Sequence, residues 1–557
     1  MTLTRREFVV TAAAGSVLVA DWLSAAPQDD RYANAFKLID TMVERFLLEM
    51  NAPGLTLAIA DRENVLRVAT YGMSDADRKE PVRPDHLFHV GSISKSFVAI
   101  ALLQLRDEGK LDLHAPVTRY LPWFRIEPRD AITTHHLLSH SSGLPSWVPV
   151  FPSDPAARHT SGFTPGAHFH YSNMGYAALG HLIETLDGRP FPEAIRARIL
   201  KPLGMNATNA TIGPQLRDQT VVSHIPYRDD RPLTRYGRLA HAPQIIFDNA
   251  AGSVASTAGD MGLYLRMLAN HGKPLLAEAT FAEMSKRHVR LDDQNEPGYG
   301  YGLFTETLDE HPIVRHTGGM VSFMSAMHID LVDGVAAFAS VNAQQGYRPN
   351  PVTTFVLRAV RAASANKPLP ELPPPNDPAT VRDASNLAGV YTSPAGEKIE
   401  FVADGDKLFL VHGGKRLPVE IAGGEPYADH PDFELFGFFF ERETPQGGRA
   451  VSVGHGARWW MSDRYTGKRT FDVPDAWRAF EGHYRNEDPW VGSGRIVIRQ
   501  GKLWLNGNAE LKQTGANTFR FAEPAYNPEW LQFLDVANGK AQHVKLSGYD
   551  LWRVEVR

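Results

Sequence analysis

The sequence predicts an α+β fold: an antiparallel sheet flanked by helices, followed by two small antiparallel β-barrel domains. Three observations lead to this prediction. Strand-like runs lie at both ends of the first 365 residues, with helical patterns between them. A proline-rich stretch follows over residues 366–379, and the helical pattern disappears after it. The remaining chain holds short β-rich runs in two similar copies.

Length and composition place the chain among globular proteins of two or three domains. It has 557 residues, of which 43% are hydrophobic and 22% charged, so a sizeable core can be buried. The net charge is −5 and no basic stripe is present, which argues against nucleic acid as a partner. The chain contains no cysteine, which excludes disulfides, thiol nucleophiles and cysteine-based metal centres.

Residues 1–26 have the pattern of an export signal. Arg5 and Arg6 precede an apolar run over residues 9–20, and the small residues Ser24, Ala25 and Ala26 follow it. The run is too short to span a bilayer, which takes about 20 residues. The arginine pair favours a twin-arginine signal, with an ordinary export signal as the alternative. We therefore expect a periplasmic or extracellular protein without a transmembrane segment in the mature chain.

The first domain is expected over residues 33–365. It should open with an amphipathic helix, continue with two strands and a helical region, and close with a hairpin that turns at Asp333 and Gly334. The expected helices span residues 34–50, 92–105, 133–138, 173–186, 192–199 and 257–269, and the expected strands span residues 54–60, 65–71, 323–331 and 335–341.

The C-terminal part carries an internal repeat. Residues 387–391 (LAGVY) match residues 480–484 (FEGHY), and residues 407–410 (KLFL) match residues 502–505 (KLWL). Residues 407–410 follow a turn signal at Asp404–Gly405, and residues 502–505 follow one at Gln500–Gly501. We expect two barrel repeats over residues 380–470 and 471–557, with one larger β-sandwich as the alternative.

The stretch from Gly91 to Phe97 (GSISKSF) holds the first candidate functional group. Ser92 and Lys95 are three residues apart at the start of a helix, so both lie on one helix face. This places an amine beside a hydroxyl, with helix N-terminal amides close by. Ser92 is therefore a candidate nucleophile and Lys95 its proton acceptor or electrostatic activator.

Two later segments complete the set of candidate motifs. Tyr171 and Asn173 lie on a loop at a helix start, where side chains can point into a cleft, and His316 begins a His-Thr-Gly-Gly segment beside a strand. A cluster of His135, His136 and His140 lacks the spacing of a metal site, so these are expected to be structural or solvent-facing histidines. We expect no metal and no cofactor.

In their order along the chain, Ser92-Ile93-Ser94-Lys95, Tyr171-Ser172-Asn173 and His316-Thr317-Gly318 resemble the motifs of the serine β-lactamase and penicillin-binding protein superfamily. The Tyr-x-Asn form of the second motif is similar to the class C branch. Residues 137–145 (LLSHSSGLP) and 202–205 (PLGM) also look like recurring segments of that family.

The resemblance implies a mechanism through an acyl-enzyme. Ser92 attacks a carbonyl, and Lys95 and Tyr171 move its proton to the leaving group and later activate water. Asn173 binds Lys95 and a substrate amide.

The resemblance also implies roles for the third motif. The backbone N–H groups of Ser92 and Gly319 form the oxyanion hole. His316, Thr317 and Gly318 line the opposite wall and bind substrate.

The third motif departs from the pattern of penicillin-targeted members, which commonly have Lys where His316 stands. Histidine is mostly neutral at pH 7, which weakens a strict requirement for an anionic substrate. Histidine at this position resembles the D-aminopeptidase and esterase branch, whose C-terminal lipocalin-like barrels also fit the repeat. The expected function is an exported serine hydrolase that cleaves an amide in a D-amino-acid-containing peptide or a related small molecule.

Three alternatives stay open: an esterase on the same scaffold, a β-lactamase, and a non-catalytic ligand-binding or cell-wall-binding protein that retains the pocket. An ordinary α/β-hydrolase is excluded as a hypothesis, because the chain lacks the Gly-x-Ser-x-Gly motif that carries the nucleophile in that fold. The sequence leaves open the choice between amide and ester and the oligomeric state.

Overall fold

The computed structural model describes residues 30–129, 131–146, 148–151, 158–232, 237–292, 297–344, 348–444, 447–488 and 491–555. The expected export signal over residues 1–26 lies outside them. Contacts group the chain into two units. The first consists of the chain up to Ser142, Thr164–Ile225 and Ala240–Pro374, and the second of Gly143–Phe163, Pro226–Leu239 and the chain from Pro375 onward.

The first unit is built on a nine-stranded antiparallel sheet whose middle is formed by strands from both ends of the unit. The strand order is β10-β11-β12-β13-β14-β15-β1-β2-β3. The N-terminal strand β1 pairs with the C-terminal strand β15, with Leu57 opposite Ala339. The strands of this sheet are β1 Gly54–Ala60, β2 Val65–Asp75, β3 Glu80–Pro81, β10 Val289–Arg290, β11 Gly298–Tyr299, β12 Phe304–Leu308, β13 His311–Met320, β14 Phe323–Asp330 and β15 Ala336–Val341.

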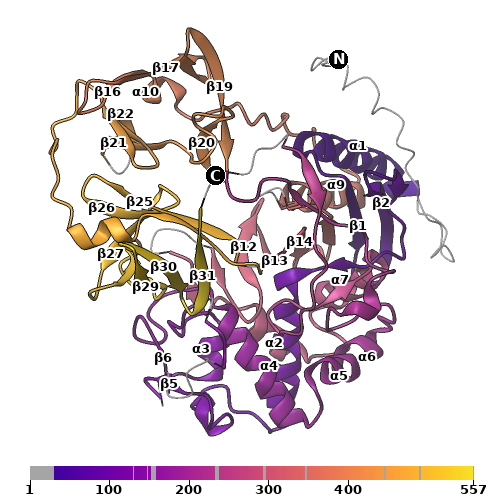
Figure 1. Ribbon diagram of the computed structural model, residues 1–557. Coiled ribbons are helices and arrows are strands. Elements are labelled where there is room, and N and C mark those ends of the chain that lie inside the picture. The colour runs from indigo at the N-terminus through magenta and orange to yellow at the C-terminus, as the bar shows by residue number, and fades with distance from the viewer. Residues whose placement is uncertain are drawn as a thin grey trace. The chain divides into compact units, whose positions relative to one another are not determined.

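Helices pack on both faces of this sheet, which confirms the predicted α+β fold (Figure 1). The helices of the first unit are α1 Ala33–Met50, α2 Ser94–Asp107, α3 Thr134–Leu138, α4 Asn173–Asp187, α5 Phe191–Ile195, α6 Lys201–Leu203, α7 Ala258–Ala269, α8 Glu278–Ser285 and α9 Asn350–Ser364. Shorter turns are η1 Asp30–Tyr32, η2 Gly91–Ile93, η3 Val117–Arg119, η4 Arg196–Leu200 and η5 Pro214–Leu216, and shorter strands are β4 Phe88–His89, β5 Ile126–Glu127, β6 His159–Thr160, β7 His224–Pro226, β8 Leu239–His241 and β9 Ala255–Ser256.

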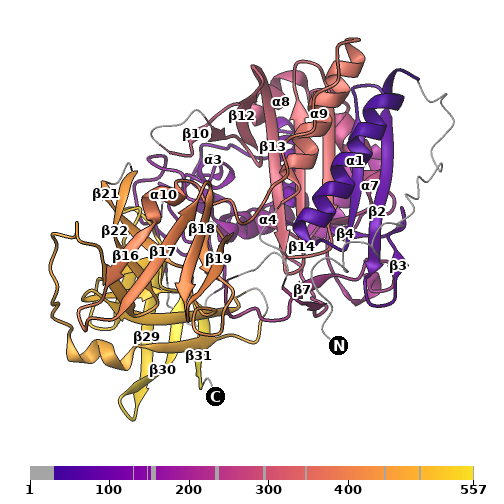
Figure 2. The same ribbon diagram turned by 90° about the horizontal axis from the view of Figure 1, so that it is seen from above.

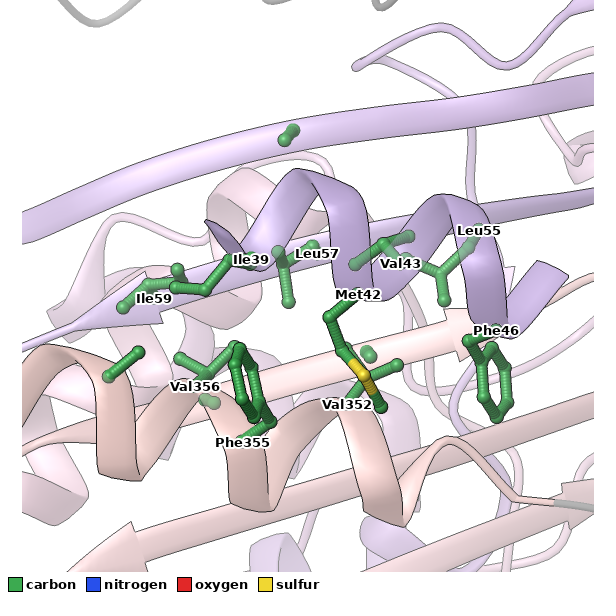
Figure 3. Close-up of a cluster of buried hydrophobic side chains, with 14 of the residues drawn as sticks. Ile39, Met42, Val43, Phe46, Leu55, Leu57, Ile59, Val352, Phe355 and Val356 are labelled. Carbon is green, nitrogen blue, oxygen red and sulfur yellow. The ribbon is translucent and has the colours of Figure 1, made fainter. Parts of the chain in front are cut away.

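One face of the sheet is covered by α1 and α9, which lie side by side (Figure 2). Figure 3 shows the apolar stripe of α1 meeting α9 and the inward side chains of β1. The stripe forms because α1 repeats apolar residues three and four positions apart. The labelled side chains are Ile39, Met42, Val43 and Phe46 from α1, Leu55, Leu57 and Ile59 from β1, and Val352, Phe355 and Val356 from α9.

The opposite face of the sheet is covered by α7, which packs on β1, β2 and β15. Thr56, Ala58 and Ala60 alternate along β1 with the residues that face α1, so they point to this side. The two alanines leave room for a helix. Thr257 caps α7 by accepting a hydrogen bond from the N–H of Asp260.

The second unit begins with an open antiparallel sheet of eight strands, in the order β20-β19-β18-β17-β16-β23-β22-β21. Its interior is filled by aromatic side chains, among them Phe401, Phe438 and Trp460. The elements are α10 Ala384–Leu387, β16 Gly389–Thr392, β17 Lys398–Asp404, β18 Lys407–His412, β19 Lys415–Ala422, β20 Glu425–Ala428, β21 Phe439–Thr444, β22 Gly447–His455 and β23 Arg458–Met461.

The last eight strands form a closed antiparallel barrel, drawn in yellow tones in Figure 1. The barrel closes because β31 pairs back onto β24, with Tyr484 opposite Arg553. The elements are η6 Asp475–Ala479, β24 Gly482–Arg485, β25 Ser493–Arg499, β26 Lys502–Leu505, β27 Ala509–Gln513, β28 Thr518–Phe521, β29 Trp530–Ala537, β30 Lys540–Leu546 and β31 Tyr549–Val554.

The sequence repeat corresponds to equivalent strands in the two sheets. Tyr391 in β16 and Tyr484 in β24 each donate a hydrogen bond to the carbonyl four residues earlier, that of Leu387 and Phe480 respectively. Both predicted hairpin turns are present, between β17 and β18 and between β25 and β26. An open sheet and a closed barrel therefore replace the single larger β-sandwich that was the alternative.

Two segments inside the expected 33–365 domain belong to the second unit, which the sequence did not predict. They are Gly143–Phe163 and Pro226–Leu239. Charged contacts hold the later one: Arg485 forms two hydrogen bonds to Asp229 at 2.9 and 2.7 Å, and Arg495 donates to Asp230 at 2.7 Å. Over the described residues, no helix is long and apolar enough to cross a membrane.

The packing of α1 against α9 gives a stability prediction. Phe355→Ala should lower the free energy of unfolding by about 3–5 kcal/mol, because Phe355 is only 3% exposed and its removal leaves a cavity. Urea unfolding followed by circular dichroism at 222 nm, where the helices of the first unit contribute most, measures the change. The matched control is Leu48→Ala on α1, which is 66% exposed and should change stability by less than about 0.5 kcal/mol. Equal effects of the two substitutions would contradict this account of the core.

Candidate active site

Ser92 lies in the turn η2 that leads into α2, and the strand β13 runs directly against this turn. Gly91 has a φ of +58°, and a Cβ at this position would lie 2.7 Å from the backbone nitrogen of Gly319. A Cβ on Gly318 would lie 1.8 Å from the carbonyl oxygen of Val90. Only glycines allow this approach. The backbone at Gly91 therefore lies directly against that of Gly318 and Gly319. The oxyanion hole formed by the N–H groups of Ser92 and Gly319 stays a prediction.

Lys95 is fully buried, and its Nζ has three oxygen neighbours. These are the Ser92 hydroxyl at 3.0 Å, Asn173 Oδ1 at 2.9 Å and the Ala251 carbonyl at 2.7 Å. Burial, together with the positive charge of Arg348, holds the pKa of Lys95 well below its ordinary value. A neutral amine has two N–H groups and one lone pair. It can donate to Asn173 and Ala251 while it accepts the proton of Ser92.

Tyr171 completes the group around the nucleophile. Lys95 Nζ lies 4.8 Å from the centroid of its ring. Burial raises the pKa of Tyr171, and a hydrogen bond with the Ser92 hydroxyl and the charge of Arg348 offset part of that increase. The phenol therefore keeps its proton at neutral pH. A phenol that keeps its proton can relay protons but cannot act as a phenolate base.

The helix α4 fixes the second motif. Ser172 is its N-cap and accepts a hydrogen bond from the N–H of Gly175 at 3.0 Å, so Asn173 is the first helical residue. The backbone N–H of Ser172 donates to His140 Nδ1 at 3.0 Å, and the rings of His140 and Tyr171 lie 4.2 Å apart. His140, expected to be structural or solvent-facing, is thus a buried residue that positions the motif.

His316 is buried in the third motif, and both of its ring nitrogens have partners within the protein. Its Nδ1–H donates to the carbonyl of Thr317 at 2.7 Å, and the hydroxyl of Tyr299 donates to its Nε2 at 3.0 Å. Burial holds the pKa of His316 well below its ordinary value, so the ring is neutral. Its contact with substrate, and those of Thr317 and Gly318, stay predictions.

Arg348, just before α9, is a site residue that the sequence analysis missed. Its Nη1 donates to the hydroxyl of Thr317, and its Nη2 lies 3.4 Å from where a Cβ on Gly319 would be. Its charge lowers the pKa values of Lys95 and Tyr171. Arg348 therefore places a permanent positive charge beside the third motif, whose own His316 is neutral. No local motif marks Arg348, so only the folding of the chain reveals its position.

The arrangement fits acyl transfer. A hydroxyl lies beside a buried amine, and a protonated phenol bonds to the same hydroxyl.

Comparisons with known proteins agree with this chemistry. The Beta-lactamase family model matches residues 38–362. The chain is 28% identical over 323 residues to Esterase EstB of Burkholderia gladioli, covering 49% of this chain and 80% of the esterase. It is 24% identical over 413 residues to Penicillin-binding protein 4* of Bacillus subtilis, covering 70% of this chain and 88% of that protein. The octameric penicillin-binding protein homologue from Pyrococcus abyssi shares the fold, with a TM-score of 0.54 and 21% identity over 85% of this chain and 99% of the homologue.

The charge of Arg348 gives a prediction about pH. Arg348→Gln should move the acidic limb of the kcat/KM profile to higher pH. Loss of a nearby positive charge raises the pKa of Lys95, so the amine stays protonated, and unable to accept the Ser92 proton, up to a higher pH. Profiles between pH 5 and 10 on one ester substrate measure the shift.

Two matched variants control that measurement. Arg348→Lys retains the charge and should leave the limb near its original position. Arg358→Gln removes a surface arginine that pairs with Asp309 and should have no effect on the limb. An unchanged limb in Arg348→Gln would show that Arg348 does not act on the base.

Proposed function

This chain belongs to the Beta-lactamase family and is a serine hydrolase, and from that premise we propose that it cleaves amides through an acyl-enzyme on Ser92. The observation that carries the proposal is the environment of Lys95. A fully buried amine with a lowered pKa lies 3.0 Å from the Ser92 hydroxyl and can accept its proton during attack on a carbonyl.

The proton then travels through Tyr171. An amine is a poor leaving group unless it is protonated, whereas an alkoxide or phenoxide leaves an ester more readily. Tyr171 keeps its proton at neutral pH and bonds to the Ser92 hydroxyl, so it can donate to a departing nitrogen and recover the proton from Lys95. This need for a donor favours an amide. Deacylation reverses the path: Lys95 and Tyr171 take a proton from the attacking water.

The substrate class follows from Arg348 and the third motif. Arg348 supplies a cation next to Thr317 and Gly319, where a carboxylate of the substrate can bind. We propose a small amide with a free carboxylate, such as a D-amino-acid-containing peptide. The Tyr-x-Asn form of the second motif supports a class C-like site.

An esterase is the second candidate. Esterase EstB is 28% identical to this chain over 80% of its own length, and the same Ser92, Lys95 and Tyr171 can serve an ester. A β-lactamase ranks third because His316 stands where penicillin-targeted members commonly have lysine.

A substrate panel tests the proposed function. We expect turnover of D-amino-acid p-nitroanilides above that of their L forms, and faster turnover when the acyl part carries a free side-chain carboxylate, as in the anilide of D-glutamate. Hydrolysis of a chromogenic cephalosporin should be slower. Tyr171→Phe should lower kcat on the anilides by at least about 100-fold and reduce ester turnover less, because esters depend less on the donor. Equal losses on both substrates would contradict the relay.

Labelling separates the enzyme from a ligand-binding protein. A serine-directed phosphonate should add its mass to Ser92 in the wild type and not in Ser92→Ala. Absence of both an adduct and turnover would favour the binding protein.

We also propose export through the N-terminal 26 residues, on the strength of the Arg5–Arg6 pair and the apolar run that follows. In a bacterial host with a twin-arginine system, the full chain should be found in the periplasmic or extracellular fraction. Arg5→Lys combined with Arg6→Lys should keep it in the cytoplasm. Normal export of this double variant would favour an ordinary export signal.

A further inference from the structure

The closed barrel β24–β31 contains a cavity of about 250 Å³. We propose that this cavity is a binding site for a small uncharged amphiphile, such as a medium-chain alcohol, an ester or an amide. An apolar cavity of about 150 Å³ is enough to hold a benzene ring, and an eight-stranded barrel is wide enough inside for one small ligand. Nothing in the proposed hydrolase chemistry uses this site.

The lining of the cavity indicates an apolar ligand body. Most of its residues are aliphatic, including Ile496, Leu505, Leu531, Val544 and Leu551. Such walls give water no hydrogen-bond partners, so an apolar occupant is favoured over solvent.

The polar groups of the lining are mostly used within the protein. The Tyr484 hydroxyl donates to the Phe480 carbonyl and accepts from Arg553, and Asn506 Oδ1 accepts from the N–H of Arg495.

Two hydroxyl groups in the lining can bind a polar head group. They belong to Ser493 and Tyr549. None of the described residues that line the cavity is a lysine, arginine or histidine, so a carboxylate head group would be buried without a cationic partner among them. An alcohol or amide can exchange hydrogen bonds with the hydroxyls. The lining therefore favours an uncharged head group over a fatty acid anion.

The related open sheet β16–β23 has a different interior, which is filled by aromatic side chains. There Phe401 packs edge-on against Phe438 and Phe440, with ring centroids 5.1 Å apart in both pairs. In the closed barrel, rings gather instead around Phe480, whose ring stacks on Phe533 at 4.2 Å. The lining of the cavity is mainly aliphatic, with Tyr484 and Tyr549 as its aromatic members.

Ion pairs on the outer face of the barrel hold two of the strands that form the cavity wall. Arg495 lies between Gly494 and Ile496, which line the cavity, so its side chain points outward, where it pairs with Asp230 at 2.7 Å. Arg485 follows Tyr484 and pairs with Asp229 in the same way. These ion pairs within the second unit hold the two strands in place, so the cavity is preformed and need not collapse.

A series of n-alcohols from butanol to decanol tests the proposal on the full chain by calorimetry. We expect one molecule bound per chain, with affinity rising about fourfold per methylene and then levelling off when the cavity is full. Octanoate should bind more weakly than octanol. Affinity that rises without a plateau, or the absence of saturable binding, would overturn the proposal.

Matched substitutions locate the site. Val544→Phe adds a ring to the cavity and should weaken octanol binding at least tenfold, whereas Val536→Phe, at a position that is 59% exposed on the same barrel, should leave it unchanged. Leu505→Ala enlarges the cavity and should move the plateau to a longer alcohol, which provides a second test if Val544→Phe does not fold. Equal binding by wild type, Val544→Phe and Leu505→Ala would place the alcohol elsewhere and refute the site.

Discussion

The burial of the Lys95 amine is the constraint on which the rest of the site depends. Removing an ammonium from water is costly unless a negative charge compensates it. The described hydrogen-bond partners of Lys95 are a hydroxyl, an amide oxygen and a backbone carbonyl, all of them uncharged. Arg348 adds a second positive charge nearby. The arrangement therefore favours a neutral amine, and a neutral amine is the form that can accept a proton from Ser92.

The site also depends on backbone contact between distant parts of the chain. The turn at Gly91 and the strand at Gly318 touch because neither residue has a side chain. The carbonyl of Ala251 and the side chain of Asn173 then close around Lys95. Catalytic geometry of this precision is held by packed sheet and helix elements rather than by mobile loops.

The second unit shows how two copies of one sequence pattern can diverge. Both keep the tyrosine that bonds four residues back, at Tyr391 and Tyr484. One copy fills its interior with rings, whereas the other closes into a barrel and leaves space among aliphatic side chains. Because packing depends on side-chain volume, a few exchanges of large for smaller residues can separate a structural domain from one that binds a ligand.

Local patterns were enough to predict the α+β fold, the repeat and its turns, and the closeness of Ser92 and Lys95, because these depend on periodicity and on residues close together in the chain. Other features became visible only in the folded chain. Arg348 lies beside Thr317, His140 supports the second motif, and both ring nitrogens of His316 are paired inside the protein. Gly143–Phe163 and Pro226–Leu239 group with the C-terminal strands. These features join residues far apart in the sequence, and their pKa values follow from burial, which no local pattern specifies.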